Sequence, residues 1–167
     1  MTRDDAVTTF YLEMRDPAAL RPASRREALE VRECEIPQFE VNRFLYRFVG
    51  APWEWTDKLG WSDAEWRAWT GNPDLRTWIG YSRGSPAGYF ELQKQSGGAV
   101  EIAYFGLAPA FIGRGFGGDL LTRCIECAWG WGATRVWVHT CSLDHPSALA
   151  NYQARGMHLY HQETHPR

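Results

Sequence analysis

One short stretch limits what this chain can fold into more than any other. An apolar run over residues 99–107 leads through a short loop into Gly113-Arg-Gly-Phe-Gly-Gly118, and a helical pattern begins directly afterwards. A glycine-rich turn between a strand and a helix gathers backbone N–H groups at the positive end of the helix dipole, where missing Cβ atoms let an anion approach. Arg114 adds a fixed positive charge. The segment therefore predicts a site for the pyrophosphate of a nucleotide-like cofactor.

Two well-known phosphate loops are poor matches to this segment. A Walker A loop ends in Lys followed by Ser or Thr, whereas here an aspartate and a leucine follow Gly118. The spacing of Gly113, Gly115 and Gly118 does match a dinucleotide-binding loop. However, the next expected strand, residues 135–141, has no acidic residue, and the strand before the glycines follows a hairpin. For the glycines alone, a tight turn that holds no ligand stays an alternative.

Two motifs resemble those of the GNAT superfamily of acetyl-CoA-dependent N-acetyltransferases. Residues 112–117 resemble its Gln/Arg-x-x-Gly-x-Gly/Ala motif, and residues 148–157, Ala-Leu-Ala-Asn-Tyr-Gln-Ala-Arg-Gly-Met, resemble its Ala-x-x-x-Tyr-x-x-x-Gly-Phe signature. Ile112 departs from the first motif and removes one side-chain donor, and His145 stands where the family often has Asn. The resemblance covers residues 77–162 well and the residues before about 75 poorly.

Local patterns predict the order of the elements. Strands are expected over residues 8–15, 77–83, 87–94, 99–107, 135–141 and 157–162, and helices over 37–48, 62–70, from the glycines to about 131, and 145–155. A capping box at residues 62–65 begins the second helix. In the first helix the expected apolar stripe consists of Phe39, Phe44, Leu45 and Phe48. An antiparallel meander followed by a β-α-β unit is an α+β arrangement with a mixed sheet.

The resemblance implies the GNAT-like acyl-CoA N-acyltransferase fold in a single domain over residues 1–167. That fold has a central, mostly antiparallel sheet with about four flanking helices, and its parallel fourth and fifth strands splay apart to admit the pantetheine arm. The gap is expected between Glu101–Leu107 and Arg135–Cys141. Family members usually have two strands after the last helix, whereas one is expected here. We therefore expect an exposed sheet edge, with either a missing strand or a partner subunit, as in a homodimer.

The resemblance also implies which groups hold acetyl-CoA. The glycine-rich segment would bind its pyrophosphate through Gly113, Arg114, Gly115, Phe116, Gly117 and Gly118. The N–H near Leu107 would polarise the thioester carbonyl at a strand irregularity, and Pro109 favours an end to regular pairing there. His145 would either contact the cofactor or substrate, or begin a helix with Pro146 in its first turn.

Acetylation of an amine needs a base and an acid. An alkyl ammonium has a pKa of about 10.4, so a group must take its proton before the amine can attack. Glu101 is our candidate base, because its Glu-Ile-x-Tyr setting is similar to that of the catalytic Glu in histone-type family members; the alternative is a carboxylate that faces solvent. Tyr152 is our candidate acid for the departing thiolate; the alternative is a ring that only packs against the cofactor.

Composition excludes several partners. The formal net charge is −2, and no apolar run of about 18 residues occurs, so we expect neither a nucleic-acid nor a membrane partner. Residues 1–5 lack the pattern of a signal peptide, which favours a cytoplasmic protein. Cys124 and Cys127 form a C-x-x-C pair inside an expected helix without a second pair, so we expect buried cysteines and no metal site.

The acceptor is less well marked. Five tryptophans crowd residues 53–69, where the family forms its first helices and its acceptor wall. They either fill the core or line an aromatic pocket for an amine or a flat apolar group, with Glu54, Asp57 or Asp63 supplying charge. Taken with the motifs, this predicts direct transfer of an acetyl group from acetyl-CoA to a primary amine of a small molecule, amino acid or peptide. The alternative is a non-catalytic acyl-CoA-binding module that uses its tryptophan-rich face for a partner.

Overall fold

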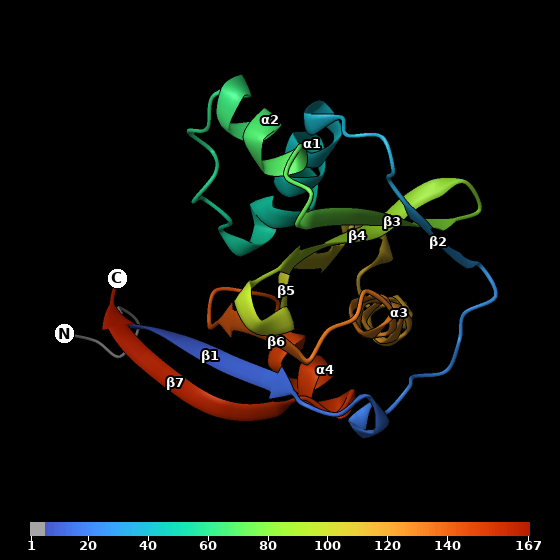
Figure 1. Ribbon diagram of the computed structural model, residues 1–167, viewed down its shortest axis with the longest axis vertical. Coiled ribbons are helices and arrows are strands. Elements are labelled where there is room, and N and C mark those ends of the chain that lie inside the picture. The colour runs from blue at the N-terminus through green and yellow to red at the C-terminus, as the bar shows by residue number, and fades with distance from the viewer. Residues whose placement is uncertain (1–5) are drawn as a thin grey trace.

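The computed structural model describes residues 6–167, which form a seven-stranded sheet with helices on both faces (Figure 1). The strands are β1 (Ala6–Met14), β2 (Leu29–Glu33), β3 (Leu75–Ser82), β4 (Ser85–Lys94), β5 (Ala99–Leu107), β6 (Arg135–Cys141) and β7 (His158–Pro166). Their order across the sheet is β2-β3-β4-β5-β6-β1-β7. β5 and β6 pair in parallel and the other described pairs are antiparallel, so the predicted α+β mixed sheet is confirmed. Residues 1–5, which carried the expectation about a signal peptide, lie outside the described range.

Two pairs of helices cover the two faces of the sheet. α1 (Phe39–Gly50) and α2 (Asp63–Thr70) lie over one face, and α3 (Phe116–Gly130) and α4 (Ala148–Ala154) lie over the other (Figure 1). The largest apolar core lies between α3 and the sheet, and two smaller clusters lie under α1 and α2. The predicted capping box begins α2, because the Ser62 hydroxyl accepts from the Glu65 N–H at 3.2 Å and the Glu65 carboxylate accepts from the Ser62 N–H at 3.4 Å.

The buried face of α1 differs from the predicted stripe. Phe39 and Leu45 are buried as expected, but Phe44 and Phe48 are 55% and 39% exposed and stack on each other with ring centroids 5.1 Å apart. The face that meets the sheet instead carries Asn42, whose amide donates to two buried acceptors of the sheet. Hydrophobicity alone misplaced the stripe, because a buried polar residue is recognisable only together with its hydrogen-bond partners.

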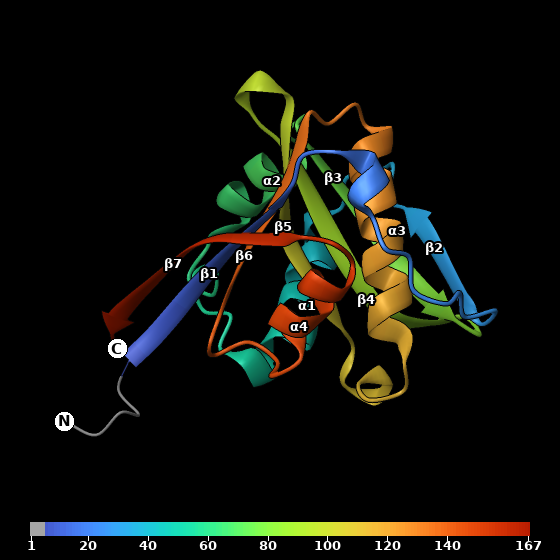
Figure 2. The ribbon, with the colours of Figure 1, turned by 90° about the horizontal axis from the view of Figure 1, so that it is seen from below.

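The first strand lies inside the sheet and not at its edge. β1 lies between β6 and β7 and pairs antiparallel with both, so β6 is not an edge strand. Arg135 of β6 links the three strands, because its guanidinium donates to Glu13 of β1 at 2.5 Å and to Tyr160 of β7 at 3.0 Å. The ribbon formed by β1 and β7 extends away from the helices (Figures 1 and 2). A single strand, β7, follows the last helix as expected and lies at the edge of the described sheet, and a homodimer stays a prediction.

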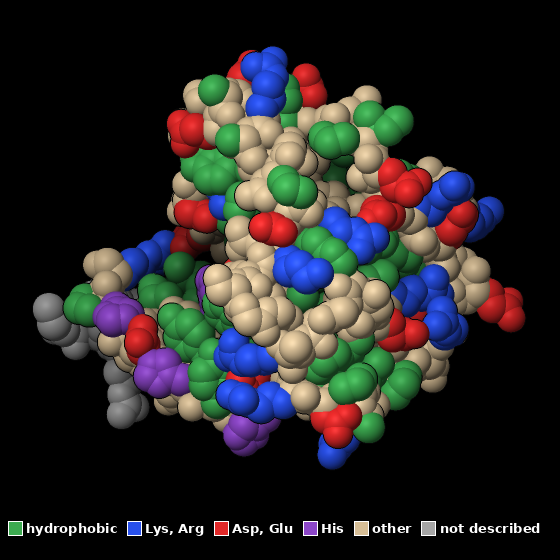
Figure 3. Space-filling model, viewed as in Figure 1, with side chains coloured by type: hydrophobic (Ala, Val, Ile, Leu, Met, Phe, Trp, Pro, Cys, Tyr) green, Lys and Arg blue, Asp and Glu red, His purple; other side chains and the backbone are tan. Residues whose placement is uncertain are grey.

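The parting of β5 and β6 opens the interior of the molecule. The two strands pair over Ala99–Glu101 and Arg135–Trp137 and then diverge, as the predicted splay requires (Figure 2). A bulge at Ala103 bends β5 within the diverging part. In the space-filling view the surface is indented between the helices α1 and α2 and the β1–β7 ribbon (Figure 3).

Candidate active site

A cavity of about 950 Å³ lies where β5 and β6 diverge. We call the glycine-rich loop and the start of α3, residues 112–118, the loop wall, and residues 53–58 with residue 69 the tryptophan wall. The strands β5 and β6 and the β6–α4 loop lie between the two walls. The full lining consists of residues 53–58, 69, 101–107, 112–113, 115, 117–118, 138–141, 144–145, 147–148 and 150–152.

The loop wall presents main-chain N–H groups. Gly115 is the N-cap of α3 in a left-handed conformation (φ 82°), and no side chain among the described residues caps this helix. Gly113 also has a positive φ, 76°, which a glycine adopts without strain. A Cβ added at Gly117 would meet Asn151 and Leu107 at 3.6 and 3.7 Å, which are ordinary van der Waals distances, so no atom crowds the first turn. The wall therefore fits an anion at a helix N-terminus.

Two of the glycines are also required by the packing around the loop. The guanidinium of Arg26 occupies the place that a Cβ on Gly115 would take, and its Nε donates to the Gly115 carbonyl at 3.2 Å. A Cβ at Gly118 would lie 2.8 Å from the Arg155 guanidinium and 2.9 Å from the Ala23 side chain. The segment before β2 thus supports the loop wall from behind. Sequence patterns did not predict this support, because its residues lie far from the glycines in the chain.

The side chains of Arg114 and Phe116 lie outside the cavity lining. The Arg114 guanidinium lies over the rings of Phe111 and Phe116, 5.3 and 5.8 Å from their centroids, and donates to the Ala110 carbonyl at 3.4 Å. The charge of Arg114 is therefore directed at these rings and not at the cradle of N–H groups.

The main chain of β5 faces the gap at Leu107. The Ala108 N–H donates to the Ala87 carbonyl at 2.8 Å, which makes these residues a hydrogen-bonded pair of the β4–β5 ladder. Such pairs alternate along an antiparallel ladder, so the next pair, Leu107 and Gly88, directs its polar groups outward. The Leu107 N–H consequently points toward the diverging β6. Pairing is regular at Leu107, and the irregularity expected there lies earlier in β5, at Ala103.

Glu101 lies at the closed end of the gap, where β5 still pairs with β6. Its side chain is 13% exposed, accepts a hydrogen bond from the Gln95 amide at 3.0 Å and lies 3.5 Å from His139 Nε2. Burial raises the pKa of the Glu101 carboxyl, while His139 and Gln95 hold back part of that rise. Glu101 is thus a largely buried acid that lines the cavity. The alternative, a carboxylate that faces solvent, does not agree with this position.

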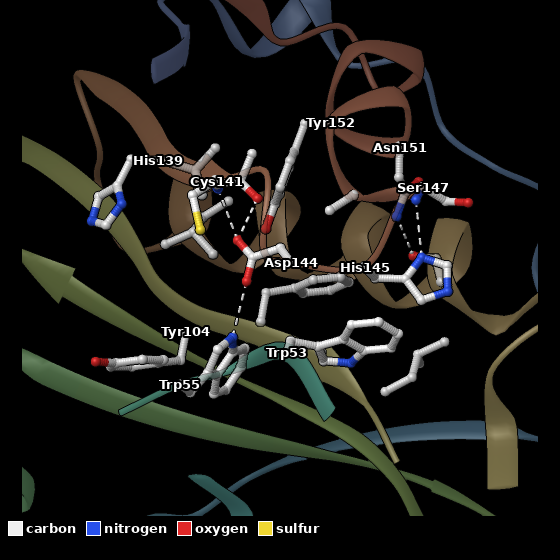
Figure 4. Close-up of a pocket in the computed structure, with 18 of the residues that line it drawn as sticks. Trp53, Trp55, Tyr104, His139, Cys141, Asp144, His145, Ser147, Asn151 and Tyr152 are labelled. Atoms are coloured by element: carbon white, nitrogen blue, oxygen red, sulfur yellow. Dashed lines mark hydrogen bonds between the residues drawn. The ribbon is translucent and has the colours of Figure 1, made fainter. Parts of the chain in front are cut away.

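Tyr152 projects from α4 into the cavity (Figure 4). The residue is buried, and its ring meets Phe105 edge to face at 6.1 Å. Burial raises the pKa of the Tyr152 phenol well above its ordinary value, and the neighbouring Asp144 and Cys124 add to the rise. The hydroxyl therefore keeps its proton at neutral pH.

Asp144 lies at the centre of the cavity and connects two of its sides (Figure 4). One carboxylate oxygen accepts from the Trp55 indole N–H at 3.1 Å. The other accepts from the Thr140 hydroxyl at 2.6 Å and from the Cys141 N–H at 3.0 Å. The bond to Trp55 joins the β6–α4 loop to the tryptophan wall across 89 residues of sequence. No local pattern marked Asp144 as a site residue, since its partners come from distant segments.

His145 belongs both to the cavity and to the turn that starts α4. Its ring meets Trp53 edge to face at 4.9 Å (Figure 4). Its Nδ1 accepts from the Ser147 N–H at 3.0 Å, and α4 begins at Ala148, later than the sequence predicts. The helix therefore does not begin at His145 with Pro146 in its first turn, and contact of His145 with the cofactor or substrate stays a prediction.

The tryptophans of residues 53–69 divide between the core and the cavity. Those that line the cavity are Trp53, Trp55 and Trp69. Trp66 is fully buried in the core, and Trp61 packs against it with ring centroids 5.2 Å apart. Of the acids considered for this region, Glu54 and Asp57 line the cavity, whereas Asp63 lies on α2 outside it.

Asp57 is the acid that the tryptophan wall presents most openly. Its side chain is 65% exposed, and its two oxygens accept hydrogen bonds from the hydroxyls of Tyr46 at 2.6 Å and Tyr104 at 2.7 Å. Burial opposes ionisation, but these hydrogen bonds and the nearby Lys58 outweigh it and lower the pKa of Asp57. The wall therefore carries a permanent negative charge at neutral pH.

Lys58 is a buried cation beside Asp57. Its side chain is 9% exposed, and its ammonium lies 3.6 Å from the Asp57 carboxylate. The ring centroids of Trp61, Trp69 and Tyr104 lie 4.2, 4.4 and 4.9 Å from the same nitrogen. Aromatic faces and one acid thus replace the water that an ammonium normally binds. The sequence showed only a lysine among tryptophans, with no sign of this cage.

Comparison with known proteins agrees with the fold. The profile described as the acetyltransferase (GNAT) family matches residues 31–157, which is most of the chain. The chain belongs to the GNAT family of acetyltransferases. The resemblance of its two motifs is thereby confirmed, and membership supports acetyl transfer as the general activity. No curated protein has a sequence that matches this one.

Solved GNAT structures share the fold of this member of the family. A GCN5-related N-acetyltransferase from Kribbella flavida is similar with a TM-score of 0.68 and 16% identity, over 94% of this chain and 56% of that chain. Another from Sphaerobacter thermophilus has a TM-score of 0.69 and 16% identity, over 95% and 50%. The chain thus spans about half the length of these two proteins. An aminoglycoside acetyltransferase from an uncultured soil metagenomic sample has a TM-score of 0.61 and 14% identity, over 80% and 95%.

Three further observations concern the described part of the chain. Within residues 6–167, no helix combines the length and the apolar character that a membrane crossing requires. The same residues contain no group of three or more His, Cys, Asp or Glu side chains placed to hold a metal ion. All four cysteines are free thiols; Cys124 is buried in α3, as predicted, while Cys127 is only half-buried.

Proposed function

We propose that the protein transfers the acetyl group of acetyl-CoA directly to a primary amine of a small molecule, amino acid or peptide. One observation carries this proposal: a single cavity combines the N–H groups at the start of α3, the gap between β5 and β6, and two buried titratable groups, Glu101 and Tyr152. Each of these features answers one requirement of acetyl transfer to an amine.

Acetyl-CoA fits the loop wall and the gap, and when bound it would supply an activated acyl group. The main chain at Gly113, Gly115 and Gly117 would hold its diphosphate, because the helix dipole favours negative charge there and no side chain of the described residues competes. The gap between β5 and β6 would take the pantetheine arm. The Leu107 N–H would donate to the thioester carbonyl and stabilise the negative charge that develops on its oxygen.

Glu101 would accept the proton of the substrate ammonium, directly or through a water molecule. A general base works best when its pKa lies close to the working pH, and burial moves the pKa of Glu101 in that direction. His139, 3.5 Å away, favours the ionised form and so limits the shift. The Glu101 carboxylate is therefore available as a base at neutral pH, and it is a stronger base than a carboxylate in water.

Tyr152 would donate a hydrogen bond to the sulfur as the thiol leaves. Complete proton transfer is uphill, because a free thiol has a pKa of about 8.5 and burial raises that of Tyr152 above a phenol's usual value of about 10. A short hydrogen bond from a protonated phenol stabilises a developing thiolate without that transfer. The position of Tyr152 in the cavity lining supports this role.

Two measurements test the proposal. Thermal stability should rise with acetyl-CoA and stay unchanged with NAD, because a ligand stabilises only the fold that binds it. A thiol-release assay over a library of primary amines should then find at least one amine that releases coenzyme A faster than water does. Stabilisation by acetyl-CoA without release by any amine would contradict the enzyme and favour a non-catalytic acyl-CoA-binding module.

A further inference from the structure

Building on the proposed transfer reaction, we infer that the acceptor is a primary amine on a flat apolar body, with no carboxylate close to the amine. The inference concerns the acceptor side of the cavity, which the tryptophan wall forms with Tyr104, Glu101 and Asp144. It rests on the charge of this side, on the contacts of its one lysine and on the way that its rings are held.

Carboxylates dominate the charge of this part of the cavity. Among the described residues that line it, four are acids, Glu54, Asp57, Glu101 and Asp144, and one is a lysine; Arg167, which lies outside the lining, pairs with Glu54 and leaves three acids. The side chain of Asp57 is 65% exposed, so its charge is open to a ligand. A partly desolvated site with this balance attracts an ammonium and repels an added carboxylate. Discrimination between two ligands arises as much from such repulsion as from attraction.

Lys58 does not offer a binding site for a substrate carboxylate. Its ammonium is enclosed by three aromatic rings and lies 3.6 Å from Asp57. The buried Glu91 lies within the electrostatic reach of the same cation. An anion that approached Lys58 would therefore also approach these acids. The lysine neutralises part of the negative charge of the wall and leaves the remainder facing the cavity.

The apolar surface that meets the acceptor is already in place. Trp55 is fixed on one side by its hydrogen bond to Asp144. On the other side its ring is seated on Gly50 and Gly106, where a Cβ would lie 2.5 Å and 3.5 Å from it. Its ring centroid lies 5.2 Å from that of Tyr104. Trp55 thus forms a rigid plate, and rigid flat surfaces favour flat ligands, because neither partner loses much conformational freedom on contact.

Trp61 is not available to the acceptor in this way, since it lies outside the lining and its face is taken by Lys58. Trp53, at the edge of the cavity, extends the plate toward His145. The rings in the lining of this side are Trp53, Trp55, Trp69 and Tyr104, and Lys58 lies over the last two. Their faces suit a ring or a fused ring attached to the reacting amine by a short linker.

Matched sets of amines test this inference by thiol release. Each set contains an aromatic amino acid, its amide and the decarboxylated amine: tyrosine, tyrosinamide and tyramine, and the corresponding compounds of tryptophan and phenylalanine. The amide keeps the bulk of the carboxylate without its charge. We expect kcat/KM to be at least about tenfold lower for the amino acid than for its amide or amine, because a like charge in a partly buried site commonly costs that much. Hexylamine, which lacks a ring, should react several-fold more slowly than phenethylamine.

Charge variants locate the effect. Asp57→Asn should lower the ratio of kcat/KM for the amide to kcat/KM for the amino acid, and Lys58→Met should raise this ratio. Lys94→Met is the matched control, because Lys94 also lies over a tryptophan, Trp131, but outside the cavity; it should leave the ratio unchanged. The ratio in the unaltered protein decides the matter even if Lys58→Met does not fold.

The outcomes separate the inference from the proposed function. If kcat/KM for the amino acids equals or exceeds that for their amides and amines, the proposed acceptor class is wrong. The same holds if a polar polycation such as an aminoglycoside reacts faster than every aromatic amine. Either result leaves the proposed acetyl transfer intact. If no amine releases thiol, the transfer proposal is wrong. Calorimetric binding of the same sets to the protein with coenzyme A then decides the charge preference: tighter or equal binding of the amino acids overturns it, and weaker binding supports it.

Discussion

The two walls of the cavity are built from different parts of their residues. The loop wall is a contiguous segment, residues 112–118, that offers main-chain N–H groups and owes its shape to absent side chains. The tryptophan wall consists of side chains whose positions depend on partners elsewhere, such as Asp144 for Trp55 and Tyr46 for Asp57. A site made of main chain depends on local backbone conformation, whereas a site made of side chains depends on the whole fold.

This difference matches the two tasks that we propose. A main-chain cradle can hold the proposed donor, acetyl-CoA, with little dependence on the remaining sequence. The acceptor differs between enzymes, and side chains from several segments can change it without altering the cradle. Substitutions should therefore affect donor binding or acceptor use separately, and four experiments would sharpen or break this contrast.

The largest effect is expected for Gly117→Asp in the loop wall. A carboxylate in the first turn of α3 favours the helix dipole, so thermal stability should stay level or rise slightly. The same charge would face the diphosphate, and the affinity for acetyl-CoA should fall by about 1,000-fold, as two like charges about 4 Å apart near a surface imply. Calorimetry and thermal unfolding measure the two quantities.

Gly60→Asp is the control for this substitution, because a Cβ at Gly60 meets no atom within 4 Å and the residue lies outside the cavity. It should change neither quantity appreciably. Acetyl-CoA binding that survives Gly117→Asp would place the diphosphate somewhere other than the start of α3.

The next effect is expected for Tyr152→Phe, between the two walls. Loss of the hydroxyl should lower kcat by about 100-fold while leaving the Kd for acetyl-CoA within about twofold, since a positioned proton donor contributes to the transition state and not to donor binding. Tyr160→Phe removes a hydroxyl from β7 outside the cavity lining and should leave kcat unchanged. Steady-state kinetics with saturating acetyl-CoA would show the loss, and an unaltered kcat would exclude Tyr152 from the mechanism.

Glu101→Gln should lower kcat/KM for the amine by about 10- to 100-fold, because a general base contributes at least this much. In the unaltered protein kcat/KM should rise with pH through the raised pKa of Glu101, since only the ionised carboxylate accepts a proton. The variant should lack this acidic limb. His139→Asn removes a neighbour that lowers the pKa of Glu101, so the limb should move to higher pH. If neither Glu101→Gln nor His139→Asn changes the pH profile of kcat/KM, another group is the base.

The smallest effect is expected from a methyl group added either at Gly106 of β5, against Trp55 of the tryptophan wall, or at Gly117 of the loop wall. At Gly106 a Cβ would collide with Val49 and press on Trp55, so Gly106→Ala should destabilise the fold by about 1–3 kcal/mol and raise the KM for the amine several-fold. At Gly117 the contacts are at ordinary distances, so Gly117→Ala should leave stability unchanged or slightly higher. Denaturant unfolding and amine kinetics would compare them, and equal effects on the amine KM would remove the distinction between the walls.

Local sequence patterns predicted the features of the fold that depend on neighbouring residues. The bounds of β5 and β6, the turn at Gly113–Gly118 and the capping box of α2 follow from patterns within a few residues, and the structure has them where they were expected. The placement of β1 between β6 and β7 could not be predicted in this way, because it depends on pairing across more than 100 residues. The patterns also failed to predict β2, a short strand with charged residues on its outer face.

The same reason explains which site residues were missed. Glu101 and Tyr152 stand in motifs of neighbouring residues and were named as candidates. Asp144, Lys58 and Arg26 gain their roles from partners 89 residues away, from a cage of rings or from a distant loop. The role of such a charged residue depends on distant residues that pack against it, so no local sequence pattern predicts it.

The most direct test of the main-chain cradle is a crystal structure of the protein with coenzyme A. We expect diphosphate oxygens within about 3 Å of main-chain nitrogens in residues 113–118, which is hydrogen-bond distance, and the pantetheine arm between β5 and β6. Coenzyme A bound elsewhere, with this turn closed by the protein's own side chains, would contradict the cradle and the transfer reaction built on it.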